Sequence, residues 1–265
     1  MREHSLTPIP DIGASYTHHT RYEAPIYRHL LFAISTGSIA VMSMMHHKLF
    51  VDSGGVDTPV GDGGALAGLA VIDADVANVF ERYGPPPDRS LPASYETLAR
   101  AIVGQQVSRA AASAIWNKME ANGVCEAVVI AGKTAEEMMH SGLSRRKAEY
   151  LIGIAAQITS GALDLDALAQ MDGDAIAARL VEIRGIGAWT ADNYRLFALA
   201  DMDAWPINDI ALQEGMKLIK SLETRPTAKQ LAELGEPWRP YRGAGALVLW
   251  HVYGILVRKV TVADI

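Results

Sequence analysis

The sequence predicts an all-α fold, a helical bundle that follows a poorly structured N-terminal extension. After residue 70, apolar residues recur at intervals of three and four through most of the chain, as they do on one face of a helix. Gly185 and Gly187 flank a single apolar residue between two such segments, which is typical of a tight turn between helices. Residues 1–70 lack the alternating strands and turns of a β domain, so we expect none there.

Composition limits the class of protein. The chain has 265 residues, of which 49% are hydrophobic, and this is enough for a sizeable core. Its net charge of −6 argues against a general nucleic-acid coat, although a few basic groups and helix N-termini on one face can still bind DNA. Cys125 is the one cysteine, so no disulfide and no cysteine-rich metal site can form within the chain, which fits a reducing compartment.

Residues 1–70 differ from the rest of the chain in composition. The opening is polar and aperiodic, and residues 51–70 are rich in Gly and Asp, as in a linker. Residues 30–45 are predominantly apolar, but this run is shorter than the ~20 residues that a membrane helix needs. We therefore expect a flexible extension over residues 1–70, or a start assigned too early, followed by one domain over residues 71–265.

The first helices of this domain carry N-terminal signals. Residues 71–83 have helical spacing, with Asp73 as a candidate N-cap. Ser94 precedes the next helix, which we expect to break around residues 104–106 and to resume as far as residue 119. Further helices are expected over residues 124–130, 134–140, 144–158, 163–171 and 173–183.

The stretch over residues 180–216 organises the site. Its first helix ends near Ile183, the glycine pair turns the chain, and a second helix starts near Ala188. Glycines leave the amides of such a turn uncovered and the second helix begins with free N–H groups, so the turn is a natural site for a phosphate diester. Asp209 follows Trp189 by twenty residues, at the head of a third helix. A phosphate site followed by a positioned acid suggests chemistry on a nucleic acid.

Three segments together carry a family resemblance. GIGAWTA (185–191), PINDIALQ (206–213) and AIVGQQVS (101–108) resemble the helix-hairpin-helix DNA glycosylase superfamily, and within it the alkylbase branch of the DNA-3-methyladenine glycosylase II type. The matching positions extend over residues 71–253. The resemblance implies an all-α, two-lobed bundle with its hairpin over residues 180–200. It also implies an enzyme of base-excision repair that flips alkylated purines, such as 3-methyladenine and 7-methylguanine, out of duplex DNA and hydrolyses their N-glycosidic bonds.

Asp209 matches the catalytic aspartate of this family. Cleavage builds positive charge on the sugar, and a carboxylate beside the sugar stabilises that cation and orients the attacking water. Asn208 stands where a second aspartate often stands in the family, and we interpret it as a helix cap. The alternative for Asp209 is an N-cap alone, which is worth ~1 kcal/mol.

The resemblance gives Trp189, Trp250 and Tyr194 as residues of the base pocket. Electron-rich indoles suit a cationic alkylated purine, since a cation over a desolvated indole gains ~2 kcal/mol; the alternative is that both tryptophans are core residues. A pocket tyrosine of some relatives falls on Asn193, and one residue along a helix is a turn of ~100°, so Tyr194 is not a simple replacement. Lysine-dependent members carry a lysine in place of Trp189, so we expect a monofunctional enzyme without AP-lyase activity.

The resemblance also gives the DNA-binding residues Gln105, Gln106, Gly185 and Gly187. Gln106 matches a wedge that fills the gap left by the flipped base, and the alternative for the two glutamines is an exposed polar turn. The amides of the glycine turn are expected to bind phosphate. Arg242 is a further candidate, either for contact with the DNA backbone or for bracing the helix of the acid.

Arg145, Arg146 and Lys147 lie in the first turn of the helix expected over residues 144–158. Basic charge there opposes the helix dipole. Proximity to the DNA backbone would explain these residues, and so would a solvated surface.

The remaining expectations concern cofactors and partners. We expect no organic cofactor and no iron–sulfur cluster, because the four cysteines that some branches carry are absent. The resemblance allows a monovalent cation at the hairpin carbonyls of residues 182–187, and no metal held by side chains. We expect a cytoplasmic, nucleoid-associated monomer that binds double-stranded DNA containing alkylated bases and forms no stable membrane association. Two alternatives stay open: a glycosylase for oxidised or mismatched bases, and a non-catalytic helix-hairpin-helix DNA-binding module.

Overall fold

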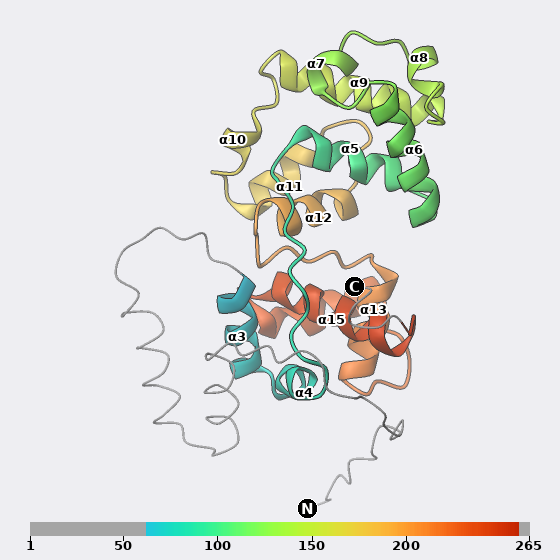
Figure 1. The fold of residues 1–265 in the computed structure, drawn as a ribbon. Helices are drawn as coiled ribbons and strands as arrows, with labels where there is room; N and C mark the ends of the chain where they lie inside the picture. Colours follow the sequence, from blue (N-terminus) through green and yellow to red (C-terminus); the bar gives the residue numbers. More distant parts are fainter. Residues whose placement is uncertain (1–61, 260–265) are drawn as a thin grey trace, which may run out of the picture. The chain divides into compact units, whose positions relative to one another are not determined.

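The structure is a computed structural model that describes residues 62–259, and these residues form helices and connecting turns without a β-strand (Figure 1). This confirms the all-α prediction. All described helices belong to one compact unit, Gly54–Ile265, and none of them is long and apolar enough to cross a bilayer. In chain order they are α3 (Asp62–Ile72), α4 (Ala74–Tyr83), α5 (Tyr95–Gly104), α6 (Arg109–Ala121), α7 (Ala127–Ile130), α8 (Ala135–Met139), α9 (Arg145–Thr159), α10 (Leu165–Leu168), α11 (Gly173–Val181), α12 (Ala188–Ala198), α13 (Ile210–Ile219), α14 (Ala228–Gly235), the 3₁₀ helix η1 (Glu236–Trp238) and α15 (Arg242–Leu256).

The helices form two groups, which confirms the two-lobed expectation. Helices α5 to α12 pack together around a core that includes Leu98, Leu151 and Leu180. Helices α13 and α15 pack against each other, with α3, α4 and α14 around them. Figure 1 draws the first group in colours from green to light orange, and the second in blue and teal for α3 and α4 and in darker orange and red for α13 and α15. The hairpin belongs to the first group and Asp209 to the second, so residues of both groups build the site.

Helix α3 corrects the sequence interpretation as a linker for residues 62–70. Leu66 and Leu69 of this helix are buried, and α3 packs against α4 and α15. Gly68 allows the close approach, because a Cβ there would lie 2.7 Å from the ring of Tyr241. Composition was misleading here because small residues serve helix packing as well as flexible linkers. Residues 1–61, which include most of the predicted extension, lie outside the described residues.

Asp73 is the N-cap predicted for the first helix of the domain. Its carboxylate accepts hydrogen bonds from the amides of Asp75 and Val76, at 3.0 Å and 3.3 Å. The same carboxylate also accepts from Lys220 Nζ and Trp238 Nε1, both at 2.6 Å. Burial raises the pKa of Asp73, but the bonds from Lys220 and Trp238 outweigh it, so the pKa is lowered. One side chain therefore ties the start of α4 to α13 and η1.

The predicted break near residues 104–106 is confirmed. Helix α5 ends at Gly104 and α6 begins at Arg109, with Ser94 and Ser108 as their N-caps. Gln106 lies in the turn between them with φ 57°, a left-handed conformation that few side chains adopt. This turn lies beside the hairpin, as the hydrogen bonds described below establish.

Candidate active site

The hairpin joins α11 to α12 through a turn that requires glycine at one position. Gly185 has φ 102°, and a Cβ there would lie 2.5 Å from the ring of Tyr150. Ile186 is buried and anchors the turn in the core. Gly187 is the N-cap of α12, provides no side-chain cap, and has open space where a Cβ would be. The first amides of α12 therefore have an open approach, as an anion site requires.

Gln105 braces this turn from the end of α5. Its Nε2 donates to Gly185 O at 3.0 Å and to Thr190 Oγ1 at 3.3 Å. Lys147 Nζ donates to the carbonyl oxygens of Gln105 and Val103, at 2.7 Å and 2.8 Å, and burial lowers the pKa of this lysine. The structure thus uses Gln105 and Lys147 to hold the hairpin against α5, and a DNA contact by Gln105 stays a prediction.

A groove of about 570 Å³ runs along the hairpin. Gln106, Arg146 and Gly187 line it, and Gln106 is exposed. Among the described residues, Arg146 has no hydrogen-bond or ion-pair partner, whereas its neighbour Arg145 pairs with Glu136 at 2.7 Å. Of the three basic residues in this turn, Arg146 is therefore the one whose charge is available to a phosphate in the groove.

The carbonyls expected to hold a monovalent cation are partly engaged within the protein. Ile183 O accepts from the amide of Ile186 at 3.0 Å, and Gly185 O accepts from Gln105. A carbonyl oxygen has two lone pairs, so these bonds leave the cation a prediction carried by the resemblance. Among the described residues, no group of three His, Cys, Asp or Glu side chains is placed to hold a metal ion.

Asp209 is the N-cap of α13, and this corrects the assignment of that role to Asn208. Asp209 Oδ1 accepts from the amide of Leu212 at 2.9 Å. Asp209 has an extended backbone, with φ −79° and ψ 118°, and the helix begins at Ile210. Asn208 therefore lies one residue outside the helix, where it is exposed. The carboxylate is held at a fixed point by the backbone of its own helix.

Two indoles converge on this carboxylate. Trp189 Nε1, from α12, donates to Asp209 Oδ2 at 2.7 Å. Trp250 Nε1, from α15, donates to Asp209 Oδ1 at 3.2 Å. Trp189 is 43% exposed, so it is not a core residue, and Trp250 stacks on Phe197 with ring centroids 5.5 Å apart. The structure therefore brings the predicted acid and both predicted tryptophans together.

A cavity of about 380 Å³ adjoins this cluster. Small-molecule sites occupy about 300–1,000 Å³, so a single base is within its capacity. Trp189, Asn193 and Phe197 line one wall, and their spacing of four residues places them on one face of α12. The other wall comes from α5 and the segment before it, which is tied to α12 by a hydrogen bond of 2.7 Å from the amide of Leu91 to Phe197 O. Trp189 also lines the hairpin groove, so the two hollows share this side chain.

Tyr194 lines the cavity as predicted but does not offer it a hydroxyl group. Its side chain is buried, and the hydroxyl oxygen has no hydrogen-bond partner among the described residues. Burial, with a smaller effect of Asp166, raises the pKa of Tyr194 to about 12. The resemblance placed a pocket tyrosine of some relatives at Asn193, and the structure places Asn193 at the cavity. Sequence reasoning missed Phe197, although its helical spacing from Trp189 was a signal that could have found it.

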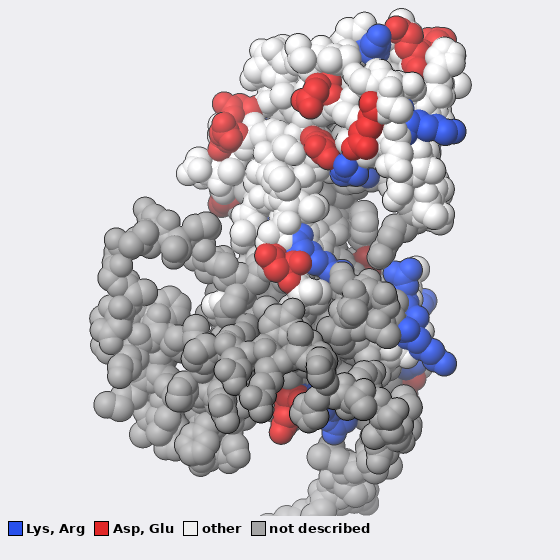
Figure 2. Space-filling view, in the orientation of Figure 1, with Lys and Arg blue, Asp and Glu red and all other residues white. Residues whose placement is uncertain are grey.

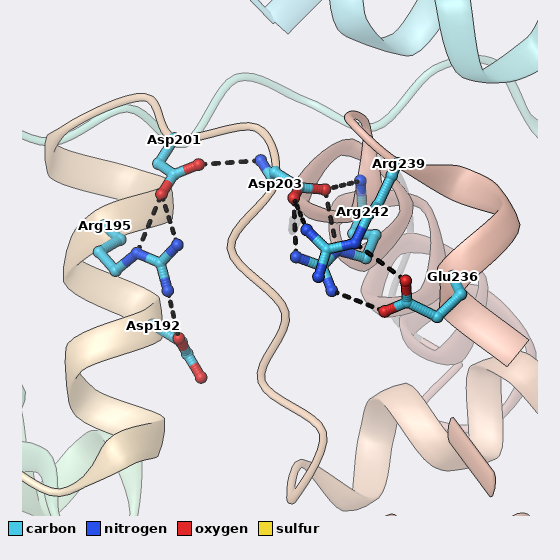
Figure 3. Close-up of polar contacts among 7 residues, drawn as sticks. All are labelled: Asp192, Arg195, Asp201, Asp203, Glu236, Arg239 and Arg242. Atoms are coloured by element: carbon cyan, nitrogen blue, oxygen red, sulfur yellow. Dashed lines mark hydrogen bonds and ion pairs between the residues drawn. The ribbon is translucent and has the colours of Figure 1, made fainter. Parts of the chain in front are cut away.

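Arg195 holds the start of the segment that leads from α12 to Asp209 (Figure 3). Its Nε and Nη2 bond Asp201 Oδ2 at 2.9 Å and 2.7 Å, and its Nη1 bonds Asp192 Oδ1 at 3.0 Å. The Arg195 side chain is only 8% exposed. Burial raises the pKa of Asp192, and Arg195 only partly opposes this. The segment that follows α12 is therefore anchored to this helix by a buried ion pair.

Arg242 holds the middle of the same segment (Figure 3). Its Nε and Nη2 donate to the two carboxylate oxygens of Asp203 at 2.8 Å and 2.7 Å, and its Nη1 donates to Glu236 at 3.2 Å. Arg239 also bonds Asp203, at 2.8 Å. Arg242 was predicted to bind DNA or to brace the helix of the acid, and this geometry favours bracing, because the guanidinium is engaged by two carboxylates.

Surface charge agrees with the net charge of the sequence. Figure 2 shows acidic side chains lying among basic ones over α6 to α9, and no continuous basic surface covers these helices on the face drawn. Recognition of phosphate by the described residues there would depend on local groups, such as helix amides and single arginines, and less on a broad positive field.

Comparison with known proteins identifies the family. Residues 99–240 match the family described as "HhH-GPD superfamily base excision DNA repair protein", where HhH stands for helix-hairpin-helix. This match covers more than half of the chain, and the chain belongs to this superfamily. The resemblance drawn from the hairpin and the aspartate is thereby confirmed.

Similar proteins within the superfamily are named as 3-methyladenine glycosylases. The chain is 32% identical over 190 residues to "DNA-3-methyladenine glycosylase 1" of Schizosaccharomyces pombe, a match that covers 70% of this chain and 83% of that protein. It is 30% identical over 175 residues to "DNA-3-methyladenine glycosylase" of Bacillus subtilis, which covers 61% of this chain and 58% of that protein. The chain thus spans less than two thirds of the length of the B. subtilis relative.

A solved structure has the same fold. The S. pombe 3-methyladenine DNA glycosylase Mag1, solved in complex with abasic DNA, superposes with a TM-score of 0.63 at 29% sequence identity. The match covers 71% of this chain and 95% of that chain.

Proposed function

We propose that the chain is a DNA glycosylase that hydrolyses the N-glycosidic bond of alkylated purines in duplex DNA. The observation that carries the proposal is the convergence of Trp189 and Trp250 on the Asp209 carboxylate, beside the open N-terminus of α12. The names of the similar S. pombe and B. subtilis proteins support 3-methyladenine as a substrate.

The carboxylate supplies the chemistry. Once the base has flipped out of the duplex, loss of the base leaves positive charge on the sugar. Asp209 is fixed by one backbone amide and two indoles, so its charge is already in place when the cation forms and no reorganisation is needed. Trp189 and Phe197 border the cavity for the extruded base, and aromatic faces favour a cationic alkylated purine.

The hairpin groove provides the contacts that hold the DNA strand. The amides after Gly187 and the free guanidinium of Arg146 suit a phosphate. Gln106 is exposed in the same groove, and we propose that it fills the gap in the duplex as the wedge. Because Trp189 borders both hollows, a nucleotide held at the groove would have its base near the cavity.

The test is base release from methylated duplex DNA, followed by chromatography of the freed bases. Asp209→Asn keeps a good N-cap and removes the charge, so we expect release of 3-methyladenine and 7-methylguanine to fall by at least ~100-fold. Asp164→Asn is the matched control, since Asp164 is an exposed N-cap of α10 and its loss should leave release unchanged. Equal release by Asp209→Asn and the wild-type protein would contradict the proposal.

Two further readouts separate the alternatives. Faster release from duplexes with 8-oxoguanine or a G·T mismatch would assign a different lesion. DNA binding without any base release would assign a non-catalytic module.

We also propose that the enzyme is monofunctional. Among the described residues, the side chains that hydrogen-bond to Asp209 are two indoles, and neither can form a Schiff base. Borohydride treatment during turnover should trap no covalent adduct with DNA, and a trapped adduct would overturn this part of the proposal.

A further inference from the structure

We propose that Asn193 selects alkylated purines that carry an exocyclic amino group, by accepting a hydrogen bond from that amino group at its Oδ1. The inference rests on the proposed glycosylase function and adds the chemical feature of the base that the cavity recognises. Asn193 lies on α12 midway between Trp189 and Phe197, on the face that lines the cavity.

A hydrogen bond fixes the orientation of the Asn193 amide. Asn193 Nδ2 donates to Trp189 O at 2.7 Å. Because a carbonyl oxygen can only accept, the NH₂ group must be the one that faces it, and Oδ1 is turned away. No described residue donates a hydrogen bond to Oδ1. The side chain therefore presents an oriented acceptor without a partner.

The other polar side chains that line the cavity are already engaged. Thr97 Oγ1 donates to a backbone carbonyl at 2.7 Å, and Ser94 Oγ accepts from the amide of Thr97 at 3.3 Å. Glu96 and Arg100 pair with each other at 2.7 Å. The Tyr194 hydroxyl is buried away from solvent. Among the side chains of this described cavity, Asn193 Oδ1 is thus an acceptor with a fixed orientation and no protein partner, whereas the exposed carboxylate of Glu96 is held by Arg100.

Alkylated purines differ in whether they can use this acceptor. Both 3-methyladenine and 7-methylguanine carry an exocyclic NH₂ group, and the positive charge of the alkylated ring makes its protons better donors. By contrast, 7-methylhypoxanthine has the shape of 7-methylguanine without the 2-amino group. A base that cannot donate leaves Oδ1 desolvated and unpaired, which disfavours that base. For a partly buried acceptor we expect a preference of about tenfold.

The test measures single-turnover release of 7-methylguanine and 7-methylhypoxanthine from otherwise identical duplexes. Each rate is divided by the spontaneous depurination rate of the same duplex, which removes the difference between the leaving groups. We expect the wild-type enhancement to be about tenfold larger for 7-methylguanine. Asn193→Leu should bring the ratio to about one, chiefly by slowing 7-methylguanine. Asn193→Asp retains acceptor oxygens but loses the donor to Trp189 O that orients the side chain, so its preference should fall between those of the wild-type protein and Asn193→Leu.

The outcomes separate this inference from the glycosylase proposal. A purely structural role of Asn193 would change both substrates equally and leave the ratio as in the wild-type protein, which would overturn the inference. An equal wild-type enhancement of both bases would overturn it as well, while base release itself would uphold the glycosylase function. If the wild-type protein releases neither base, both the glycosylase proposal and this inference are overturned.

Discussion

Trp189 Nε1 lies 2.7 Å from Asp209 Oδ2, so a single hydrogen bond joins the hairpin helix α12 to the carboxylate at the head of α13. The same helix offers its free N-terminal amides at Gly187. The proposed phosphate site and the proposed catalytic acid are therefore linked through one indole. A shift of the hairpin would be transmitted to the carboxylate.

Trp189→Phe tests this link, because phenylalanine keeps an aromatic ring and removes the donor. Hydrogen bonds to charged groups contribute about 1.5–3 kcal/mol, so we expect single-turnover base release to slow by about tenfold or more. DNA affinity should stay within about twofold, since the hairpin amides are untouched. Trp250→Phe removes the longer bond, of 3.2 Å, and should cost less. An unchanged rate for Trp189→Phe would show that the indole does not position the acid.

Arg195→Met tests the buried ion pair that holds the segment before Asp209. The substitution leaves Asp201 without its guanidinium partner in a nearly buried site, so we expect the free energy of unfolding to fall by about 3 kcal/mol. Arg184→Met is the control, since Arg184 is 76% exposed and lies 3.5 Å from Glu149, and it should cost less than about 1 kcal/mol. Urea denaturation measures both variants. Equal losses of unfolding free energy in the two variants would mean that burial does not increase the contribution of the Arg195 ion pair to stability.

The sequence was informative wherever a local signal determines the structure. Asp73 was predicted as an N-cap and Ser94 as the residue before the next helix, because a cap depends only on the next three residues. The glycine turn was predicted because two glycines flanking one apolar residue allow a tight turn, and Gly185 takes a positive φ in the structure. The capping box of α14, at Thr227 and Gln230, was also a local signal, but it was not used.

Long-range relationships were not predictable in the same way. The bidentate pair of Arg242 with Asp203 joins residues 39 positions apart, and composition does not reveal which arginine will be buried. Helix α3 was missed because the role of Gly68 depends on the ring of Tyr241, far along the chain. For the same reason Trp189 and Trp250 were assigned to a pocket by resemblance, while their shared contact with Asp209 required the structure.

Arg146→Ala tests whether the free guanidinium in the hairpin groove contacts a phosphate. Loss of one phosphate contact should weaken binding to any duplex and lower the slope of log Kd against log salt concentration by about 1. Arg145→Ala is the matched control, with the same charge change one residue away, because Arg145 is paired with Glu136. Fluorescence anisotropy over a series of salt concentrations measures both. The same slope change in the two variants would indicate a general effect of charge and no specific contact.

The burial of His251 predicts that the free energy of unfolding depends on pH. It is 1% exposed, its Nδ1 is buried without a partner, and burial lowers its pKa below the ordinary value of 6.5. Below pH 6.5 the unfolded chain takes up a proton that the folded protein does not, so the free energy of unfolding falls as the pH decreases toward the folded pKa. Stability from this group is therefore fully present above pH 6.5 and is lost on acidification.

His251→Gln and His251→Leu both remove this titration, and the glutamine retains a polar amide near Tyr83 O, which lies 3.4 Å from His251 Nε2. We expect urea denaturation between about pH 7 and pH 5 to show a shallower loss of stability in both variants than in the wild-type protein. The slope is the decisive quantity, because lost packing lowers stability equally at every pH and shifts the whole curve. Parallel curves for the variants and the wild-type protein would mean that His251 takes up its proton as readily in the folded state as in the unfolded chain.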